Sequence, residues 1–126
     1  MAKKTIMTID DSSSIRHAVR DILSEKGYNV VEARHGEAGL QYLTGKKVHL
    51  ILLDLNMPTM DGYEFLKEFK ENPKYKEYQT TPIVILTTET EKKSKETAKV
   101  LGAYGWISKP FMPETLVAIV NEHSRD

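Results

Sequence analysis

Apolar runs alternate with amphipathic segments along the chain. Runs of apolar and β-branched residues predict strands over residues 5–9, 28–33, 48–55, 82–87 and 105–108. Apolar side chains at helical spacing predict helices over residues 12–26, 37–43, 63–69, 89–102 and 113–122. Stretches as continuous as HLILL and IVIL are typical of strands covered on both faces. The pattern therefore indicates βα units around a parallel sheet.

Five strands alternating with five helices predict an α/β fold. Right-handed crossovers turn such a (βα)5 chain into a doubly wound, five-stranded parallel sheet. Ligands of these sheets bind beyond the carboxyl ends of the strands. The residues at those ends are therefore the first candidates for function.

The helix predicted over residues 89–102 has the weakest apolar pattern. Only Ala98, Val100 and Leu101 can form its apolar face. We therefore expect a helix in this segment that has few buried contacts with the rest of the domain and is mobile.

The connection over residues 70–82 is longer and more polar than a minimal one. Its composition predicts a solvated loop. The alternative, a contact with a partner, rests on Tyr75 and Tyr78 alone.

Polar residues follow four of the predicted strands. Asp10 and Asp11 end the first, Asp54 the third and Thr87 the fourth, and Lys109 follows the fifth. Each residue alone has an ordinary structural explanation as a helix cap, a turn initiator, a strand former or a solvated charge. Two adjacent carboxylates repel by about 1 kcal/mol in water and about 4 kcal/mol near a protein surface. A positive group is therefore expected beside Asp10 and Asp11.

A hard divalent cation fits these residues. Magnesium prefers oxygen ligands and keeps several waters, so a few carboxylates and a carbonyl suffice. Asp11 and Asp54 are candidates for direct ligands, Asp10 for a ligand through water, and the backbone carbonyl of Asn56 for the last protein ligand.

Asp54 is also the candidate nucleophile. A carboxylate can attack phosphorus to form an aspartyl phosphate. The reaction then needs alignment and neutralisation of the phosphoryl oxygens. The cation, the Lys109 ammonium and the Thr87 hydroxyl can each serve one oxygen.

The composition narrows the choice of partners and compartment. Lys plus Arg and Asp plus Glu number 18 each, so the formal net charge is zero and gives no electrostatic signature for nucleic acid or a membrane surface. The 126 residues suit a single domain over 1–126 with no output domain, and the lack of Cys and of a long apolar run favours a cytoplasmic location.

The chain resembles the receiver domain of two-component response regulators, and its stand-alone chemotaxis CheY-like group in particular. The motifs that carry the resemblance are IDDSSSIR, LILLDLNMPTMDGYEFL, PIVILTT and LGAYGWISKPF. The resemblance implies a flavodoxin-like sheet of order 2-1-3-4-5. It also implies phosphorylation of Asp54 by a histidine kinase, followed by self-dephosphorylation. The other implied roles are Mg2+ binding by Asp10, Asp11, Asp54 and Asn56, phosphoryl binding by Thr87 and Lys109, and a cis peptide bond before Pro110.

Two positions depart from the family pattern. Trp106 stands where the family usually has Tyr or Phe, and its bulkier indole is expected to restrict the inward rotamer that signals activation. Thr88 replaces a small residue and is expected to change access to Asp54. Asn56 and Glu89 occupy the two positions by which family members tune self-hydrolysis, and the resemblance of this polar pair to that of short-lived chemotaxis switches implies a labile phosphate.

The favoured function is a phosphorylation-controlled protein-binding switch in chemotaxis or motility. The resemblance implies a CheA-like histidine kinase, a target such as a flagellar motor switch protein or another signalling protein, and a phosphatase as partners. In the family, the helix expected over 89–102, the fifth strand and the last helix form the surface that changes partners.

A phosphorelay shuttle or phosphate sink is the alternative with the same chemistry. An independent Mg2+-dependent phosphatase ranks lower, because Asn56 stands where such an enzyme would need a second carboxylate. A flavin-binding module ranks lowest, because the acidic loop after residue 9 cannot cradle a phosphate. We therefore expect no enzyme that acts on an external substrate.

Overall fold

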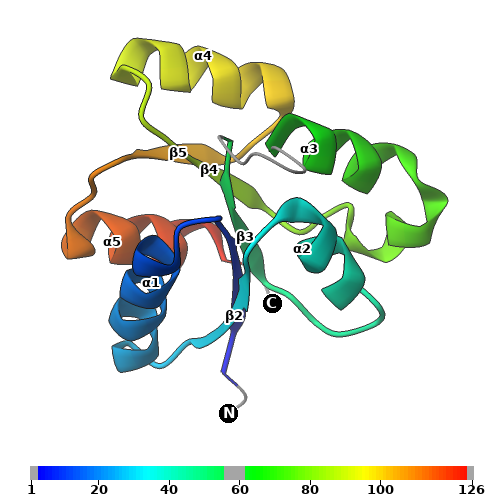
Figure 1. Cartoon of the computed structure of the whole chain (residues 1–126), viewed down its shortest axis with the longest axis horizontal. Helices are drawn as coiled ribbons and strands as arrows, with labels where there is room; N and C mark the ends of the chain where they lie inside the picture. The colour runs from blue at the N-terminus through cyan, green and yellow to red at the C-terminus, as the bar shows by residue number, and fades with distance from the viewer. Residues whose placement is uncertain (1–2, 56–61, 125–126) are drawn as a thin grey trace.

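The computed structural model describes residues 3–55 and 62–124. Strands and helices alternate along these residues, as the sequence predicts (Figure 1). The strands are β1 (Thr5–Ile9), β2 (Asn29–Ala33), β3 (Leu50–Asp54), β4 (Ile83–Thr87) and β5 (Gly105–Ser108). The α-helices are α1 (Ser13–Glu25), α2 (Gly36–Tyr42), α3 (Gly62–Glu71), α4 (Glu91–Leu101) and α5 (Pro113–His123). A 3-10 helix, η1 (Pro73–Tyr78), lies between α3 and β4.

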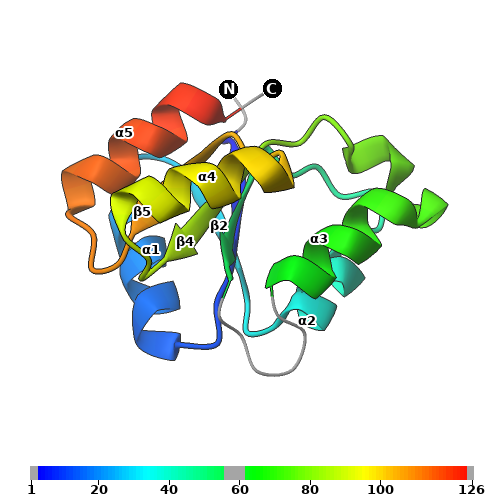
Figure 2. The same cartoon turned by 90° about the horizontal axis from the view of Figure 1, so that it is seen from above.

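The strands form one parallel sheet in the order β2-β1-β3-β4-β5, which confirms the predicted fold class. Helices α1 and α5 cover one face of the sheet, and α2, α3 and α4 cover the other (Figures 1 and 2). Every residue of β3 and β4 is buried, as expected for central strands packed on both sides. All five strands therefore end at the same edge, where ligands of this fold bind.

Local sequence signals set the boundaries of α1 and α4. Ser12 caps α1, and its side chain accepts a hydrogen bond from the Ile15 N–H. Thr90 caps α4 in the same way through the Lys93 N–H. Gly102 ends α4 in the left-handed conformation, with φ of 72°, which glycine adopts without a steric cost.

The prediction of a solvated loop over residues 70–82 is wrong for residues 73–78, although most of the segment is solvent-exposed as predicted. Residues 73–78 form η1, which begins at Asn72, whose side chain accepts from the Lys74 N–H. Tyr75 and Tyr78 are buried; the Tyr75 ring stacks on Phe69 and the Tyr78 hydroxyl donates to the Lys46 carbonyl at 2.7 Å. Burial raises the pKa of both tyrosines above the ordinary value of a tyrosine. These two rings belong to the core and are unavailable to a partner.

Helix α4 buries few residues, although its apolar face differs from the predicted one. Ser94 and Ala98 are its buried residues, and Leu101 is partly buried. Val100 is 84% exposed, because it lies two positions from Ala98 and so on the opposite side of the helix. The Lys70 ammonium of α3 donates to the Leu101 carbonyl and so satisfies a backbone group at the end of α4.

Gly62 permits the close approach of α3 to the end of β3. A Cβ at this position would lie 2.7 Å from the Leu55 Cα and 2.9 Å from the Asp54 carbonyl oxygen. Both are backbone atoms, so relief requires movement of the strand end. We expect Gly62→Ala to lower the free energy of unfolding by about 3 kcal/mol, measured by urea titration.

Gly39→Ala is the matched control for this substitution. A Cβ at Gly39 meets the tip of the Ile9 side chain at 2.7 Å, and that tip can move. Alanine also gains roughly 0.5–1 kcal/mol over glycine inside a helix. Gly39→Ala should therefore cost clearly less than Gly62→Ala, and equal costs would contradict the explanation from backbone contact.

Candidate functional site

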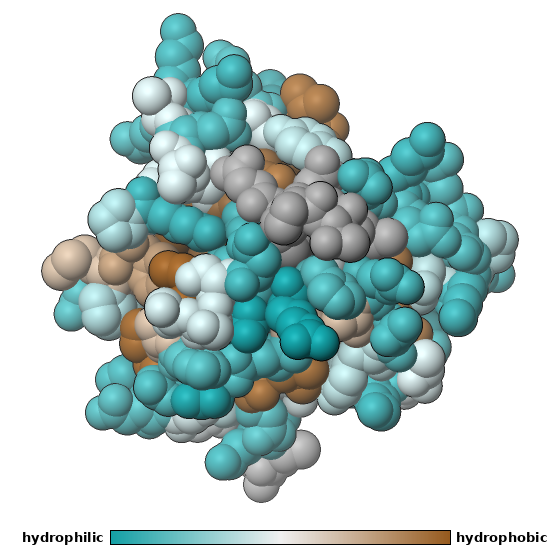
Figure 3. Space-filling view, viewed as in Figure 1, coloured by the Kyte–Doolittle hydropathy of each residue, from teal (hydrophilic) through white to brown (hydrophobic). Residues whose placement is uncertain are grey.

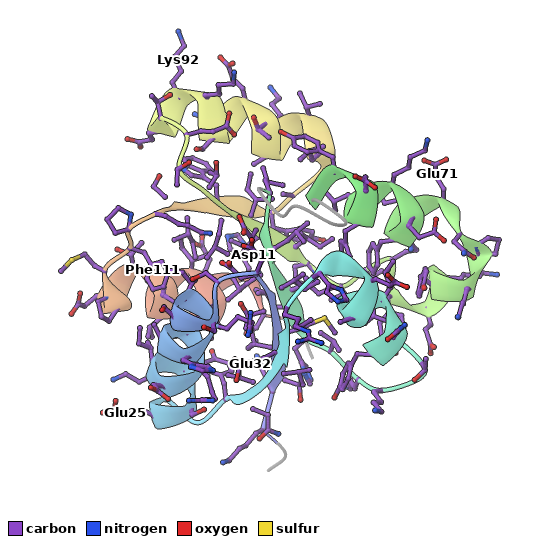
Figure 4. All side chains as sticks on the ribbon, in the orientation of Figure 1. Asp11, Glu25, Glu32, Glu71, Lys92 and Phe111 are labelled. Carbon is purple, nitrogen blue, oxygen red and sulfur yellow. The ribbon has the colours of Figure 1, made fainter. Side chains whose placement is uncertain are left out.

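The carboxyl ends of the strands bring the predicted site residues together. Asp10 follows β1, Asp54 ends β3, Thr87 ends β4 and Lys109 follows β5. Asp10 and Asp54 are 1% and 2% exposed, and Thr87 is fully buried. Asp11 is exposed and lies where β1 leads into α1, near the centre of the view in Figure 4. The topology thus gathers into one pocket residues that are up to 99 positions apart.

Three carboxylates and one ammonium form the centre of this pocket. Carboxylate oxygens of Asp10, Asp11 and Asp54 lie within 4.8 Å of one another. The Lys109 Nζ lies 3.0 Å from Asp10 Oδ2 and 3.2 Å from Asp54 Oδ1. Lys109 is therefore a positive group beside the acidic pair, yet the cluster keeps two formal negative charges in excess. Such an excess favours a bound cation.

The donor set fits magnesium. Grouped carboxylate oxygens are the ligands that this hard cation prefers, whereas thiolates are absent from the sequence. Asp10, Asp11 and Asp54 are the described residues that would hold the ion. The predicted fourth ligand, Asn56, lies outside the described residues.

Backbone contacts hold Asp10 in place. Its N–H donates to the Ala33 carbonyl at 3.0 Å, and its Oδ1 accepts from the Ser12 N–H at 2.9 Å. Its carbonyl accepts from the Arg16 guanidinium at 2.7 Å. Arg16 was not among the site residues predicted from the sequence. The available signal was its position four residues after the cap Ser12, which returns its side chain to the start of the helix.

Thr87 forms its hydrogen bonds with Glu89. The Thr87 hydroxyl oxygen accepts from the Glu89 N–H at 3.1 Å, and the hydroxyl donates to Glu89 Oε1 at 3.3 Å. The Lys93 ammonium lies 4.0 Å from the other Glu89 carboxylate oxygen. The sequence placed Glu89 as a tuning residue, and the structure links it directly to Thr87 and to the first turn of α4.

The remaining predicted residues flank this centre. Trp106 on β5 is partly buried against the core cluster on the α3 and α4 side of the sheet. Thr88 is exposed immediately after β4. The peptide bond between Lys109 and Pro110 is cis, as the resemblance implies, and the Lys109 N–H donates to the Thr87 carbonyl at 2.8 Å.

Apolar side chains are exposed near the ends of α4 and α5. Val100, Tyr104 and Met112 are among the large hydrophobic residues with the highest exposure. Trp106, Phe111 and Met112 are among the residues that line a groove of about 420 Å³ beside β5 and α5. In Figure 3 brown atoms mark the end of α4, and further brown and tan atoms lie on the side of α5. Among the described residues, no helix has the length and apolarity needed to cross a membrane.

The fold and the pocket define an α/β domain with a carboxylate site at the carboxyl edge of a parallel sheet. Residues 6–121 match the family described as the response regulator receiver domain. The chain therefore belongs to this family, and its relatives place it among the CheY-like receivers. Phosphorylation and Mg2+ binding are general properties of the family.

Similar proteins differ in their overall organisation. A Campylobacter jejuni chemotaxis protein CheY homolog is 35% identical, over 88% of this chain and 85% of its own length. The crystallised Vibrio cholerae chemotaxis protein CheY4 is 39% identical with a TM-score of 0.84, over 97% of this chain and 99% of that one. A probable transcriptional regulator, ycf27 of Porphyridium aerugineum, is 36% identical, but the chain spans only 47% of its length.

Proposed function

We propose that the chain is a phosphorylation-controlled protein-binding switch that receives its phosphoryl group on Asp54. The observation that carries this proposal is the cluster of three carboxylates, of which Asp10 and Asp54 are buried, with Lys109 between those two. Asp54 ends β3 at the carboxyl edge of the sheet, and its buried carboxylate lies 3.2 Å from the Lys109 ammonium. Similarity to the two chemotaxis proteins supports a role in chemotaxis or motility.

The chemistry takes place on the chain's own carboxylate. An Asp54 oxygen attacks the phosphorus of a phosphohistidine, the P–N bond breaks, and the departing imidazole nitrogen takes a proton from solvent. Water later attacks the same phosphorus, the P–O bond to Asp54 breaks, and the carboxylate, inorganic phosphate and a proton result. Lys109 is placed to stabilise charge on the phosphoryl oxygens. When bound, Mg2+ supplies further positive charge for the same oxygens.

The partners follow from this chemistry. A CheA-like histidine kinase would supply the phosphoryl group, and a phosphatase would shorten its lifetime. The target would be a motor switch protein or another signalling protein that docks on the surface made by α4, β5 and α5. No turnover of an external substrate is proposed.

Intact mass after incubation with acetyl phosphate tests the proposal. We expect one phosphoryl adduct on the wild-type protein in millimolar Mg2+ and none when EDTA removes the ion. Fluorescence of Trp106, the single tryptophan, is recorded in the same samples and should change with the adduct. An adduct without any fluorescence change would favour the alternative of a phosphorelay shuttle or sink. Absence of an adduct, also with a kinase as donor, would contradict the whole proposal.

A further inference from the structure

A network of charged residues joins α1 and β2 to the backbone of Asp10. The Arg16 Nη1 donates to the Asp10 carbonyl at 2.7 Å, and its Nε lies 3.4 Å from Glu32 Oε1. The Arg16 side chain is only 13% exposed. Glu32 lies on β2 beside Thr8 of β1, on the side of the sheet that α1 covers (Figure 4). A guanidinium can serve both acceptors at once because its donors form a rigid fork.

All four polar groups of Asp10 have a defined partner. Its N–H, Oδ1 and Oδ2 contact Ala33, Ser12 and Lys109, as described above. The carbonyl bond to Arg16 is the remaining contact, and it fixes the plane of the peptide between Asp10 and Asp11. The N–H of Asp11 belongs to this same peptide unit. The direction in which the exposed Asp11 carboxylate points therefore depends on the plane of that peptide.

The charge of Arg16 acts against cation binding, whereas its geometry favours it. A guanidinium near the carboxylates repels a divalent cation. Glu32 offsets that charge and also lies 3.1 Å from Arg20 Nη1 and 3.7 Å from His17 Nε2. Removal of Arg16 would thus strengthen Mg2+ binding if charge dominated, and weaken it if orientation dominated.

We infer that Arg16, anchored by Glu32, is a positioning residue for the cation site. It orients the Asp10–Asp11 peptide so that both carboxylates face the ion, and Glu32 neutralises the charge that this orientation introduces. The inference rests on the proposed function, because it assumes that Mg2+ is the cation bound by Asp10, Asp11 and Asp54.

Calorimetric titration with Mg2+ alone tests the inference. Arg16→Met should weaken Mg2+ binding about tenfold, the lower end of the range for residues that support metal ligands. Arg16→Lys should fall between wild type and Arg16→Met, because an ammonium cannot hold the carbonyl and Glu32 in the same geometry. Arg20→Met is the matched control: it removes one positive charge from the same Glu32 but has no hydrogen bond to Asp10. Its Mg2+ affinity should stay equal or rise.

The direction in which Mg2+ affinity changes in Arg16→Met decides whether the inference stands. Equal or tighter Mg2+ binding by folded Arg16→Met would overturn the inference and leave the proposed function intact. If Arg16→Met does not fold, Arg16→Lys, which keeps the positive charge, replaces it; weaker Mg2+ binding than wild type supports the inference, and equal or tighter binding overturns it. A wild-type protein that binds no Mg2+ and gains no adduct would overturn both.

Discussion

Asp54→Asn should abolish the phosphoryl adduct completely. The asparagine side chain keeps the shape of aspartate, but its neutral amide is too weak a nucleophile to attack phosphorus. Asp10 is not expected to replace it, because its Oδ1 already accepts from the Ser12 N–H and its Oδ2 from the Lys109 ammonium. Intact mass after incubation with acetyl phosphate and Mg2+ should therefore show unmodified protein only.

Asp21→Asn is the control for this loss. Asp21 is an exposed residue of α1 that contacts Arg20 at 3.3 Å, outside the pocket. This variant should acquire the adduct as the wild type does. An adduct that persists in Asp54→Asn would transfer the role of acceptor to another residue, with Asp11 as the first to test.

Lys109→Met should destabilise the protein by about 3 kcal/mol in the absence of Mg2+, since loss of one partner from a buried ion pair typically costs 3–5 kcal/mol. The substitution removes the ammonium that contacts Asp10 and Asp54, and so leaves their mutual repulsion greater. The remaining site is more negative and should bind Mg2+ more tightly. Millimolar Mg2+ should therefore raise the melting temperature of Lys109→Met more than that of the wild type.

Lys92→Met provides the matched comparison. Lys92 is exposed on α4 and points away from the sheet (Figure 4). Its replacement changes the net charge equally but should leave both stability and the effect of Mg2+ near wild type. If Lys109→Met were as stable as Lys92→Met without Mg2+, Lys109 would have no stabilising role in the pocket.

The sequence was sufficient to predict the sheet and the position of its ligand edge. Continuous apolar runs at the third and fourth strands are a strong signal, because few other structures bury every side chain of a segment. Once the strands are parallel, Asp10, Asp54 and Lys109 must meet at one edge. Their roles in phosphorylation remain predictions, whereas their proximity is a property of the structure.

Features that depend on long-range packing could not be predicted in the same way. Tyr75 is buried because η1 folds back on Phe69. The polar sequence of residues 70–82 contains no pattern that predicts this contact. The buried side of α4 passes through Ser94, a polar residue that an apolar pattern cannot select. Arg16 has an ordinary position in an amphipathic helix, and only the structure shows its bond to the Asp10 carbonyl.

The position of Lys109 also has a consequence for the edge of the sheet. β5 is a terminal strand that pairs with β4 alone, and Lys109 follows it directly. The Lys109 N–H is bound to β4, while its ammonium reaches carboxylates that follow β1 and end β3. The occupancy of the pocket and the local unfolding free energy of this edge strand are therefore thermodynamically linked. A signal can therefore reach the surface as a change in the local unfolding free energy of β5, without a hinge or a rigid-body rotation.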